Sequence, residues 1–284
     1  MARKIVQALT AVLYNLNITG FFTGRIYQGS LKNVCVPGLN CYSCPGALGS
    51  CPVGAFQSSI GAVQFKVSLY VSGFLIFVGA LFGRFICGWV CPFGLIQELL
   101  HKIPSKKIRG ARAFRPLKYL KYVILGVFVI ILPTLYFLQS GISSPAFCKY
   151  ICPAGTLEAG MPLVLMNESL QASIGWLFSW KVVFLVATLV WSVFIYRPFC
   201  RFICPLGAIY ALFNKIAVFG LRLAPERCIH CGKCASVCKM EVDPSINPGA
   251  AECIRCGDCV KACPTNALSF RVAQKRETKG IAQG

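Results

Sequence analysis

The sequence is poor in charged residues and contains almost no histidine. Charged residues make up 13% of the 284 residues and apolar residues 56%, whereas a soluble domain carries about 25% charged residues. Only His101 and His230 are present and no Cys-x-x-Cys-His string occurs, which excludes a multi-haem cytochrome. The apolar content excludes a disordered basic tail, and despite a net charge of +20 the composition is not that of a nucleic-acid binder. We therefore expect a membrane protein.

Four apolar stretches are long enough, or nearly long enough, to cross a bilayer. A span needs about 20 apolar residues, with a range near 17–25. The stretches lie at about 5–24, 67–83, 122–138 and 182–196. Asn15 and Asn17 interrupt the first, and the fourth reaches the required length only with Lys181 at the membrane surface. We predict a mainly α-helical membrane domain over residues 1–221 with four transmembrane helices.

The distribution of positive residues predicts the orientation of the chain. The loop over residues 84–121 holds nine lysines and arginines and a single acidic residue, Glu98. The positive-inside rule places this loop in the cytoplasm. With four spans, both termini are then cytoplasmic, and residues 25–59 and 139–179 face outward. We expect a multi-pass protein of a prokaryotic cytoplasmic membrane, in contact with its lipid.

Cysteine is abundant, with 18 residues in a chain too long to be a small disulfide-stapled scaffold. The pattern Cys-Pro-x-Gly occurs four times, beginning at Cys51, Cys91, Cys152 and Cys204. In the last three copies another cysteine stands four residues earlier: Cys87, Cys148 and Cys200. The copies alternate between the outer and inner faces, which predicts two tandem halves.

The Cys-Pro-x-Gly pattern suits a ligand at a helix start. Proline is favoured in the first helical turn, so the cysteine before it lies where free N–H groups favour an anion. The two inner arms supply four thiolates, the usual number for one [4Fe–4S] cluster: Cys87, Cys91, Cys200 and Cys204. Zinc also binds four thiolates, and free buried cysteines are a second alternative.

The outer face carries six cysteines: Cys35, Cys41, Cys44, Cys51, Cys148 and Cys152. The repeat predicts Cys51, Cys148 and Cys152 as ligands of an outer cluster, with Cys44 as the fourth. Cys35 and Cys41 are then left to form a disulfide, to take a ligand place or to bind a second metal. Three disulfides are the competing interpretation, because the exterior is oxidising.

A polar, cysteine-dense segment follows the membrane domain and predicts a small α+β ferredoxin domain over residues 222–270, followed by a polar tail at 271–284. It contains C-x2-C-x2-C-x3-C twice, from Cys228 to Cys238 and from Cys253 to Cys263, which is the pattern of bacterial ferredoxins with two [4Fe–4S] clusters. In that pattern the fourth cysteine of each run binds the other cluster. The first cluster is therefore predicted on Cys228, Cys231, Cys234 and Cys263, and the second on Cys253, Cys256, Cys259 and Cys238.

The cysteines therefore predict four [4Fe–4S] clusters and electron transfer between the two faces of the membrane. The obstacle is the hydrocarbon core, about 30 Å thick, which would separate the inner and outer clusters unless the loops dip inward. Apolar residues surround the motifs, but re-entrant backbone is tolerated only when it is buried in protein. A quinone, a flavin or a partner subunit would also bridge the gap.

These parts resemble a known group of membrane polyferredoxins, that of the periplasmic nitrate reductase system, with relatives in nitrous-oxide reduction and in copper-dependent assembly of cytochrome oxidase. The resemblance rests on the four spans, the motifs Cys87/Cys91 and Cys200/Cys204, and the ferredoxin, and it covers about Gly83–Phe270. It implies electron transfer between a cytoplasmic or quinol pool and a periplasmic redox protein. The six outer cysteines depart from the nitrate-type pattern, so the specific partner of that system is not carried over.

We predict a membrane-integral electron-transfer subunit that works between a cytoplasmic, ferredoxin-like donor and a quinone or an extracytoplasmic flavo- or metalloprotein. No catalytic residues are predicted, so the chain is expected to be an electron-transfer component of an oxidoreductase complex, used at low oxygen. One alternative is an assembly factor that reduces a metal for a partner metalloenzyme. Another is an iron–sulfur redox sensor.

Overall fold

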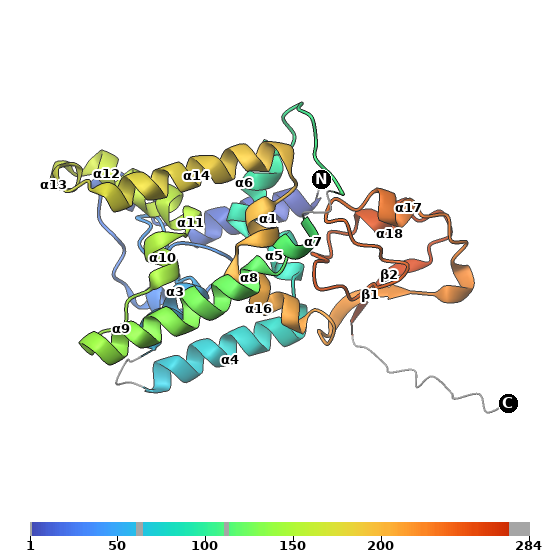
Figure 1. Ribbon diagram of the computed structural model, residues 1–284, viewed down its shortest axis with the longest axis horizontal. Coiled ribbons are helices and arrows are strands. Elements are labelled where there is room, and N and C mark those ends of the chain that lie inside the picture. The colour runs from blue at the N-terminus through green and yellow to red at the C-terminus, as the bar shows by residue number, and fades with distance from the viewer. Residues whose placement is uncertain (1, 61–64, 111–113, 273–284) are drawn as a thin grey trace.

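The computed structural model describes residues 2–60, 65–110 and 114–272. Most of the predicted polar tail, residues 273–284, lies outside the described residues. Figure 1 shows a mainly helical part at one end of the molecule and a small lobe with two short strands at the other. The arrangement agrees with the expectation of a mainly helical structure that carries a small ferredoxin-like region.

Long helices run lengthwise through the helical part (Figure 1). They are α1 (Ala2–Tyr14), α4 (Phe65–Phe82), α14 (Trp176–Phe194) and a continuous helix made of α8 (Leu120–Ile124), the π-helical η2 (Leu125–Ile131) and α9 (Leu132–Ser140). Two are long and apolar enough to cross a membrane, Leu120–Ser140 and Trp176–Phe194, and only 17% of the apolar window of each is buried. A core helix of a soluble protein is mostly buried, so these helices present apolar surface suited to lipid.

The apolar stretch at residues 5–24 does not form one continuous helix. Helix α1 ends at Tyr14, and α2 (Ile18–Thr23) follows after a break. In the break, the side-chain amide of Asn15 donates to the Ala11 carbonyl at 2.9 Å, and that of Asn17 donates to the Pro45 carbonyl at 2.8 Å. Asparagine competes with the helical backbone for hydrogen bonds, which ends the helix here. The apolar stretch at 67–83 lies within α4, whose described apolar part, Leu69–Phe82, is shorter than a full span.

Short helices carry the cysteine motifs and fill the interior of the helical part. They are α3 (Pro52–Ser59), α5 (Phe85–Trp89), α6 (Pro92–Leu100), α10 (Ala146–Tyr150), α11 (Pro153–Gly155) with its continuation through η3 (Thr156–Gly160) and α12 (Met161–Met166), α15 (Pro198–Phe202) and α16 (Pro205–Phe213). The remaining short elements are η1 (Ser30–Asn33), α7 (Phe114–Leu117) and α13 (Glu168–Ala172). Phe93, Phe147 and Phe199 on these helices are fully buried, so the motif helices form the core.

The small lobe is held by one two-stranded antiparallel sheet and by its cysteines. Strand β1 (Phe219–Leu223) pairs with β2 (Leu268–Val272), and between them lie η4 (Pro225–Arg227), α17 (Lys233–Ser236) and α18 (Asp258–Ala262). Leu221, Cys259 and Leu268 form a small buried cluster within the lobe, while Met240, Val242 and Ile254 pack into the core of the helical part. The lobe's own cluster is small, so groups that cross-link the cysteines would add to its stability.

A buried ion pair joins the lobe to the inner cysteine motifs. The Arg84 guanidinium lies 2.7 Å from the Glu252 carboxylate and also donates to the Cys200 carbonyl at 2.9 Å. Lys121 pairs with the same carboxylate at 2.5 Å. The side chains of Arg84 and Lys121 are fully buried. Two of the positive residues of the loop at 84–121 therefore bind the lobe.

Gly88 permits the closest approach across this junction. A Cβ atom at Gly88 would lie 2.2 Å from the Ile254 carbonyl oxygen, so no larger residue fits without movement. Trp89 next to it donates from its indole nitrogen to the Arg255 carbonyl at 3.0 Å. The segment that carries Cys253 is thereby held directly against the segment that carries Cys87.

We expect Gly88→Val to loosen the lobe from the helical part, because the added side chain overlaps the backbone of Ile254. Overpacking of this kind costs about 1–3 kcal/mol. Amide hydrogen exchange over residues 250–256 should therefore accelerate. The matched control is Gly73→Ala, because nothing lies within 4 Å of a Cβ at Gly73. Equal exchange rates in the two variants would contradict this view of the junction.

Candidate functional site

The four Cys-Pro-x-Gly motifs share one local geometry. In each copy the cysteine stands immediately before the first residue of a helix, and the proline occupies the first turn. The sulfur of Cys152 accepts a hydrogen bond from the Gly155 N–H at 3.4 Å, and the sulfur of Cys204 accepts one from the Gly207 N–H at 3.4 Å. Cys51 and Cys91 stand at the same position before their helices without this bond. Each sulfur therefore lies at the positive end of a helix, as the sequence pattern predicts.

The motif glycines let opposing arms approach one another. A Cβ at Gly54 would lie 3.6 Å from the Cys148 sulfur, and one at Gly155 would lie 3.5 Å from the Cys41 sulfur. A Cβ at Gly94 would lie 2.8 Å from the Arg197 guanidinium. The contacts at Gly54 and Gly155 are ordinary van der Waals contacts, whereas at Gly94 a larger residue would require Arg197 to move.

The four inner cysteines come together between α5–α6 and α15–α16. Cys87, Cys91, Cys200 and Cys204 are each no more than 6% exposed. Their thiols interact electrostatically, Cys91 with Cys200 and Cys204 with the other three. Burial and the neighbouring Cys200 thiol raise the pKa of the Cys91 thiol to about 12. A thiolate at this position needs a bound cation or cluster to compensate its charge.

A glutamine clamps each pair of motif arms. The side-chain amide of Gln97 donates to the Cys200 sulfur at 3.1 Å, and its carbonyl accepts from the N–H of the preceding residue, Phe199, at 3.2 Å. Gln57 makes the same pair of contacts on the outer side, with the Cys148 sulfur at 3.7 Å and the N–H of the residue before it at 2.9 Å. The inner and outer sets are therefore built alike.

These glutamines had no role predicted from the sequence. The sequence does contain one sign of such a role: the seventh residue of every motif, counted from its cysteine, carries a polar group. These residues are Gln57, Gln97, Glu158 and Tyr210. The other two members reach into the first outward loop: Glu158 accepts from the Cys41 N–H at 2.7 Å, and the Tyr210 hydroxyl donates to the Pro37 carbonyl at 3.0 Å. Burial raises the pKa of Glu158 to about 7, although the Cys41 N–H opposes this shift.

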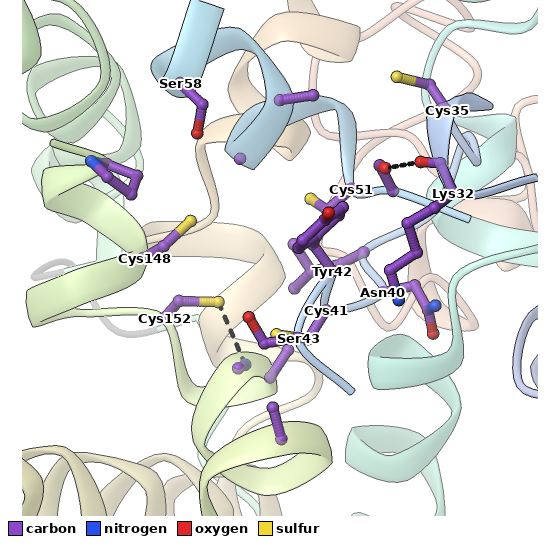
Figure 2. A pocket seen from close by; sticks show the side chains of 18 of the residues that line it. Lys32, Cys35, Asn40, Cys41, Tyr42, Ser43, Cys51, Ser58, Cys148 and Cys152 are labelled. Carbon is purple, nitrogen blue, oxygen red and sulfur yellow. Dashed lines mark hydrogen bonds between the residues drawn. The ribbon is translucent and has the colours of Figure 1, made fainter. Parts of the chain in front are cut away.

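The outer cysteines surround a cavity of about 1310 Å3. Its lining includes Cys35, Cys41, Cys51, Cys148 and Cys152. Figure 2 shows Cys148 and Cys152 on one side of the cavity, Cys41 and Cys51 across from them, and Cys35 farther away. The Cys51 thiol interacts electrostatically with those of Cys41, Cys148 and Cys152. The Cys41 thiol also interacts with that of Cys152, and the Cys148 thiol with those of Cys41 and Cys152.

Cys44 lies apart from this set. It does not line the cavity in the part of the chain that the structure describes. Its thiol, 1% exposed, instead donates to the Asn15 side-chain oxygen at 3.5 Å. The repeat predicts Cys44 as the fourth outer ligand; the structure places Cys41 on the lining of the cavity, where its N–H donates to the Glu158 carboxylate at 2.7 Å.

The ferredoxin cysteines form the two expected groups. Cys228, Cys231, Cys234 and Cys263 line one small cavity of about 20 Å3. The Cys259 thiol interacts electrostatically with those of Cys253, Cys256 and Cys238. The fourth cysteine of each run therefore lies with the other run, as the sequence pattern predicts.

The cysteine sets suit a cluster better than the alternatives weighed from sequence. None of the 18 cysteines forms a disulfide. Zinc holds its sulfurs at about 2.3 Å, hence within about 4.6 Å of one another, and among the described residues no three cysteine, histidine or acidic side chains converge closely enough for a single ion. The four inner thiols are buried, and Cys91 and Cys204 among them stand at helix N-termini, a setting that fits an anionic four-iron cluster.

Comparison with known proteins gives the same chemistry. One family model, described as a 4Fe-4S binding domain, matches residues 65–110, 123–161 and 176–223, and a second with the same description matches residues 250–269. These ranges contain the inner motifs and the second ferredoxin run. No solved structure matches the chain.

Three curated relatives illustrate the range of similar proteins. An uncharacterized protein of Methanocaldococcus jannaschii, MJ0750, is 30% identical over 205 residues, covering 70% of this chain and 76% of that protein. The putative electron transport protein YccM of Escherichia coli is 28% identical over 251 residues, covering 84% and 66%. The regulatory protein NosR of Pseudomonas aeruginosa is 30% identical over 170 residues, which is 57% of this chain but 21% of NosR.

We expect Gln97→Leu to lower the thermal stability of the protein. The substitution leaves the buried Phe199 N–H without its acceptor, which costs about 1–3 kcal/mol. The matched control is Gln7→Leu, because Gln7 is fully buried and its amide atoms have no hydrogen-bond partner among the described residues. Thermal denaturation in detergent should show a lower Tm for the first variant and an unchanged or higher Tm for the second. The reverse order would refute the clamp.

Proposed function

The chain belongs to the 4Fe-4S binding domain family, and from this premise we propose that it is a membrane-integral protein that conducts electrons between a cytoplasmic donor and a quinone or extracytoplasmic redox partner. The observation that carries the proposal is the line of four cysteine sets, from the ferredoxin lobe through the inner motifs to the outer cavity. When bound, a [4Fe–4S] cluster supplies a site that takes up and releases one electron. The residues of the chain hold these sites in order, and burial excludes water from the inner set.

We assign four clusters, two in the lobe, one inner and one outer. The lobe and inner ligands are the sets already described. For the outer cluster we propose Cys41, Cys51, Cys148 and Cys152, because these four line one cavity and Cys44 binds Asn15 instead. Arg84 supports a connection between the lobe and the inner set, because its guanidinium interacts with the thiols of both Cys87 and Cys253.

The proposed topology has four spans and two tandem halves. Two apolar helices of sufficient length support it, together with the matched contacts of Gln57 and Gln97. The start of α1 and the ferredoxin lobe lie at the same end of the molecule (Figure 1), which agrees with a cytoplasmic location for both. The positive loop at residues 84–121 reaches this end through Arg84 and Lys121.

The decisive measurement of this proposal is the iron content of the purified protein and of two cysteine variants. Four clusters correspond to about 16 iron atoms per chain. We expect Cys41→Ser to lose the outer cluster and to fall to about 12, whereas Cys44→Ser should retain about 16. About 12 iron atoms in the unmodified protein would remove the outer cluster from the proposal.

The same variants test conduction in sealed vesicles. Dithionite added outside should reduce ferricyanide enclosed within vesicles that carry the unmodified protein or Cys44→Ser. Vesicles that carry Cys41→Ser should reduce it at the rate of protein-free vesicles. Equal rates in Cys41→Ser and the unmodified protein would show that electrons do not pass through the outer set.

A second candidate function is reduction of a metal for delivery to a partner metalloenzyme. It is favoured by Cys35, whose side chain lines the same cavity but is not one of the four proposed cluster ligands. Cys35 is 4% exposed, and its thiol interacts with that of Cys51. If the protein reduces and delivers a metal, we expect it to bind Cu(I). Cys35→Ser should then abolish Cu(I) binding and leave the iron content unchanged. Equal copper affinity of the variant and the unmodified protein would remove the candidate.

A further inference from the structure

A further cavity, of about 790 Å3, lies between the ferredoxin lobe and the start of the apolar helix Leu120–Ser140. Figure 1 shows α7 and α8 on the side of the helical part that faces the lobe. The volume lies within the range of about 300–1,000 Å3 that is usual for small-molecule sites. The junction of the two parts therefore leaves room for a ligand.

The lining of this cavity is largely apolar and aromatic. One wall comes from the start of the apolar helix and the residues before it, and the other from the lobe segment 241–252. The apolar and aromatic members are Pro116, Tyr119, Tyr122, Val242, Ile246, Ala250 and Ala251. Two tyrosine hydroxyls and the side-chain amide of Asn247 add groups that donate hydrogen bonds. Such a lining suits an apolar ring that carries hydrogen-bonding oxygens.

Ion pairs with neighbouring residues neutralise two of the three carboxylates on the lining. The Glu252 carboxylate pairs with Arg84 at 2.7 Å and with Lys121 at 2.5 Å. The Glu241 carboxylate pairs with Arg201 at 2.5 Å. A charged ligand, such as a phosphate or an anionic lipid headgroup, would compete with these pairs, whereas a neutral ligand leaves them intact. The charges of the cavity therefore favour a neutral ligand.

The cavity opens toward the membrane surface. Tyr119, immediately before the apolar helix, is 70% exposed, and Val123, one turn farther along the helix, is also exposed. Residues four apart lie on the same face of a helix, so apolar surface continues from the cavity along the membrane-facing helix. Tyrosine is typical of the headgroup level of a bilayer. A ligand with a long apolar tail can therefore enter from the lipid.

The lobe wall of the cavity adjoins two cysteine sets. Glu252 directly precedes Cys253, a predicted ligand of the second ferredoxin cluster. Arg84 donates to the Ala251 carbonyl at 3.0 Å and, with its other terminal nitrogen, to the Cys200 carbonyl at 2.9 Å. One buried side chain thus connects the cavity wall with the inner set, and the chain itself connects it with the ferredoxin set.

We propose that this cavity binds the ring of a quinone, with the tail of the quinone along the exposed face of the apolar helix. This inference rests on the proposed function, and it places the quinone at the inner face. Reduction of a quinone takes two electrons and two protons and forms two O–H bonds, one on each carbonyl oxygen. The electrons arrive one at a time from the two adjoining cysteine sets. The protons come from cytoplasmic water at the edge of the cavity, where Ile246 is exposed.

The test is isothermal titration of the purified protein in detergent with decylubiquinone, a short-chain quinone. We expect Tyr119→Ala to raise the Kd about tenfold, because it removes a ring from the lining. The exposure of Tyr119 makes this variant compatible with folding. The matched control is Tyr70→Ala, a half-exposed tyrosine on the lining of the outer cavity, which should leave the Kd unchanged. The opposite pattern, or no saturable binding to the unmodified protein, would overturn the site.

Phosphatidylglycerol tests the competing occupant, a lipid. We expect this lipid to leave the Kd for decylubiquinone unchanged, because the carboxylates of the lining are already paired. If phosphatidylglycerol displaces the quinone from the unmodified protein and binds less tightly to Tyr119→Ala, the cavity is a lipid site and the proposal is wrong.

Two outcomes separate this inference from the proposed function. Protein that holds about 16 iron atoms and conducts electrons in sealed vesicles, but binds no quinone, would overturn the quinone site and leave the proposed function standing. Protein that binds decylubiquinone through Tyr119, but does not conduct in sealed vesicles, would support the quinone site and overturn electron transfer through the outer set.

Discussion

The structure depends on placing sulfur anions in a nearly water-free interior. A buried thiolate is unfavourable unless donors and positive charge surround it. The Cys-Pro-x-Gly motif meets this demand locally, because the proline starts a helix behind the cysteine, and in two copies the glycine N–H also binds the sulfur. Buried arginines meet it at longer range, since Arg84 and Arg197 lie beside the inner thiols and are both fully buried.

The same arginines also hold the parts of the molecule together. Arg197 pairs with Glu98 at 2.7 Å, and Glu98 also binds Arg3 of α1 at 2.7 Å. Arg84 pairs with Glu252 of the ferredoxin lobe. Removing one partner of such a buried pair leaves an uncompensated charge, which is strongly destabilising. The positive charge of this chain therefore serves the interior as well as the membrane topology.

Position in the chain was a good guide to a ligand where a motif supplied the whole local geometry. The fourth cysteines of the ferredoxin runs, Cys238 and Cys263, lie with the opposite runs as the spacing indicates. Spacing does not indicate the different surroundings of Cys41 and Cys44, which stand only three residues apart in the first outward loop but contact different parts of the structure. The bend that separates them comes from Glu158 and Asn15, which are remote in sequence.

The sequence by itself determined the helical membrane character, the cysteine-bearing helix starts and the pairing of the ferredoxin runs, because each depends on composition or on residues close in the chain. The tertiary structure decided that the first apolar stretch breaks at Asn15, that Cys41 lines the outer cavity while Cys44 contacts Asn15, and that Leu39 and Asn40 are buried. These features depend on hydrogen bonds to distant residues, such as Asn15 to Asn40 and Tyr210 to Pro37.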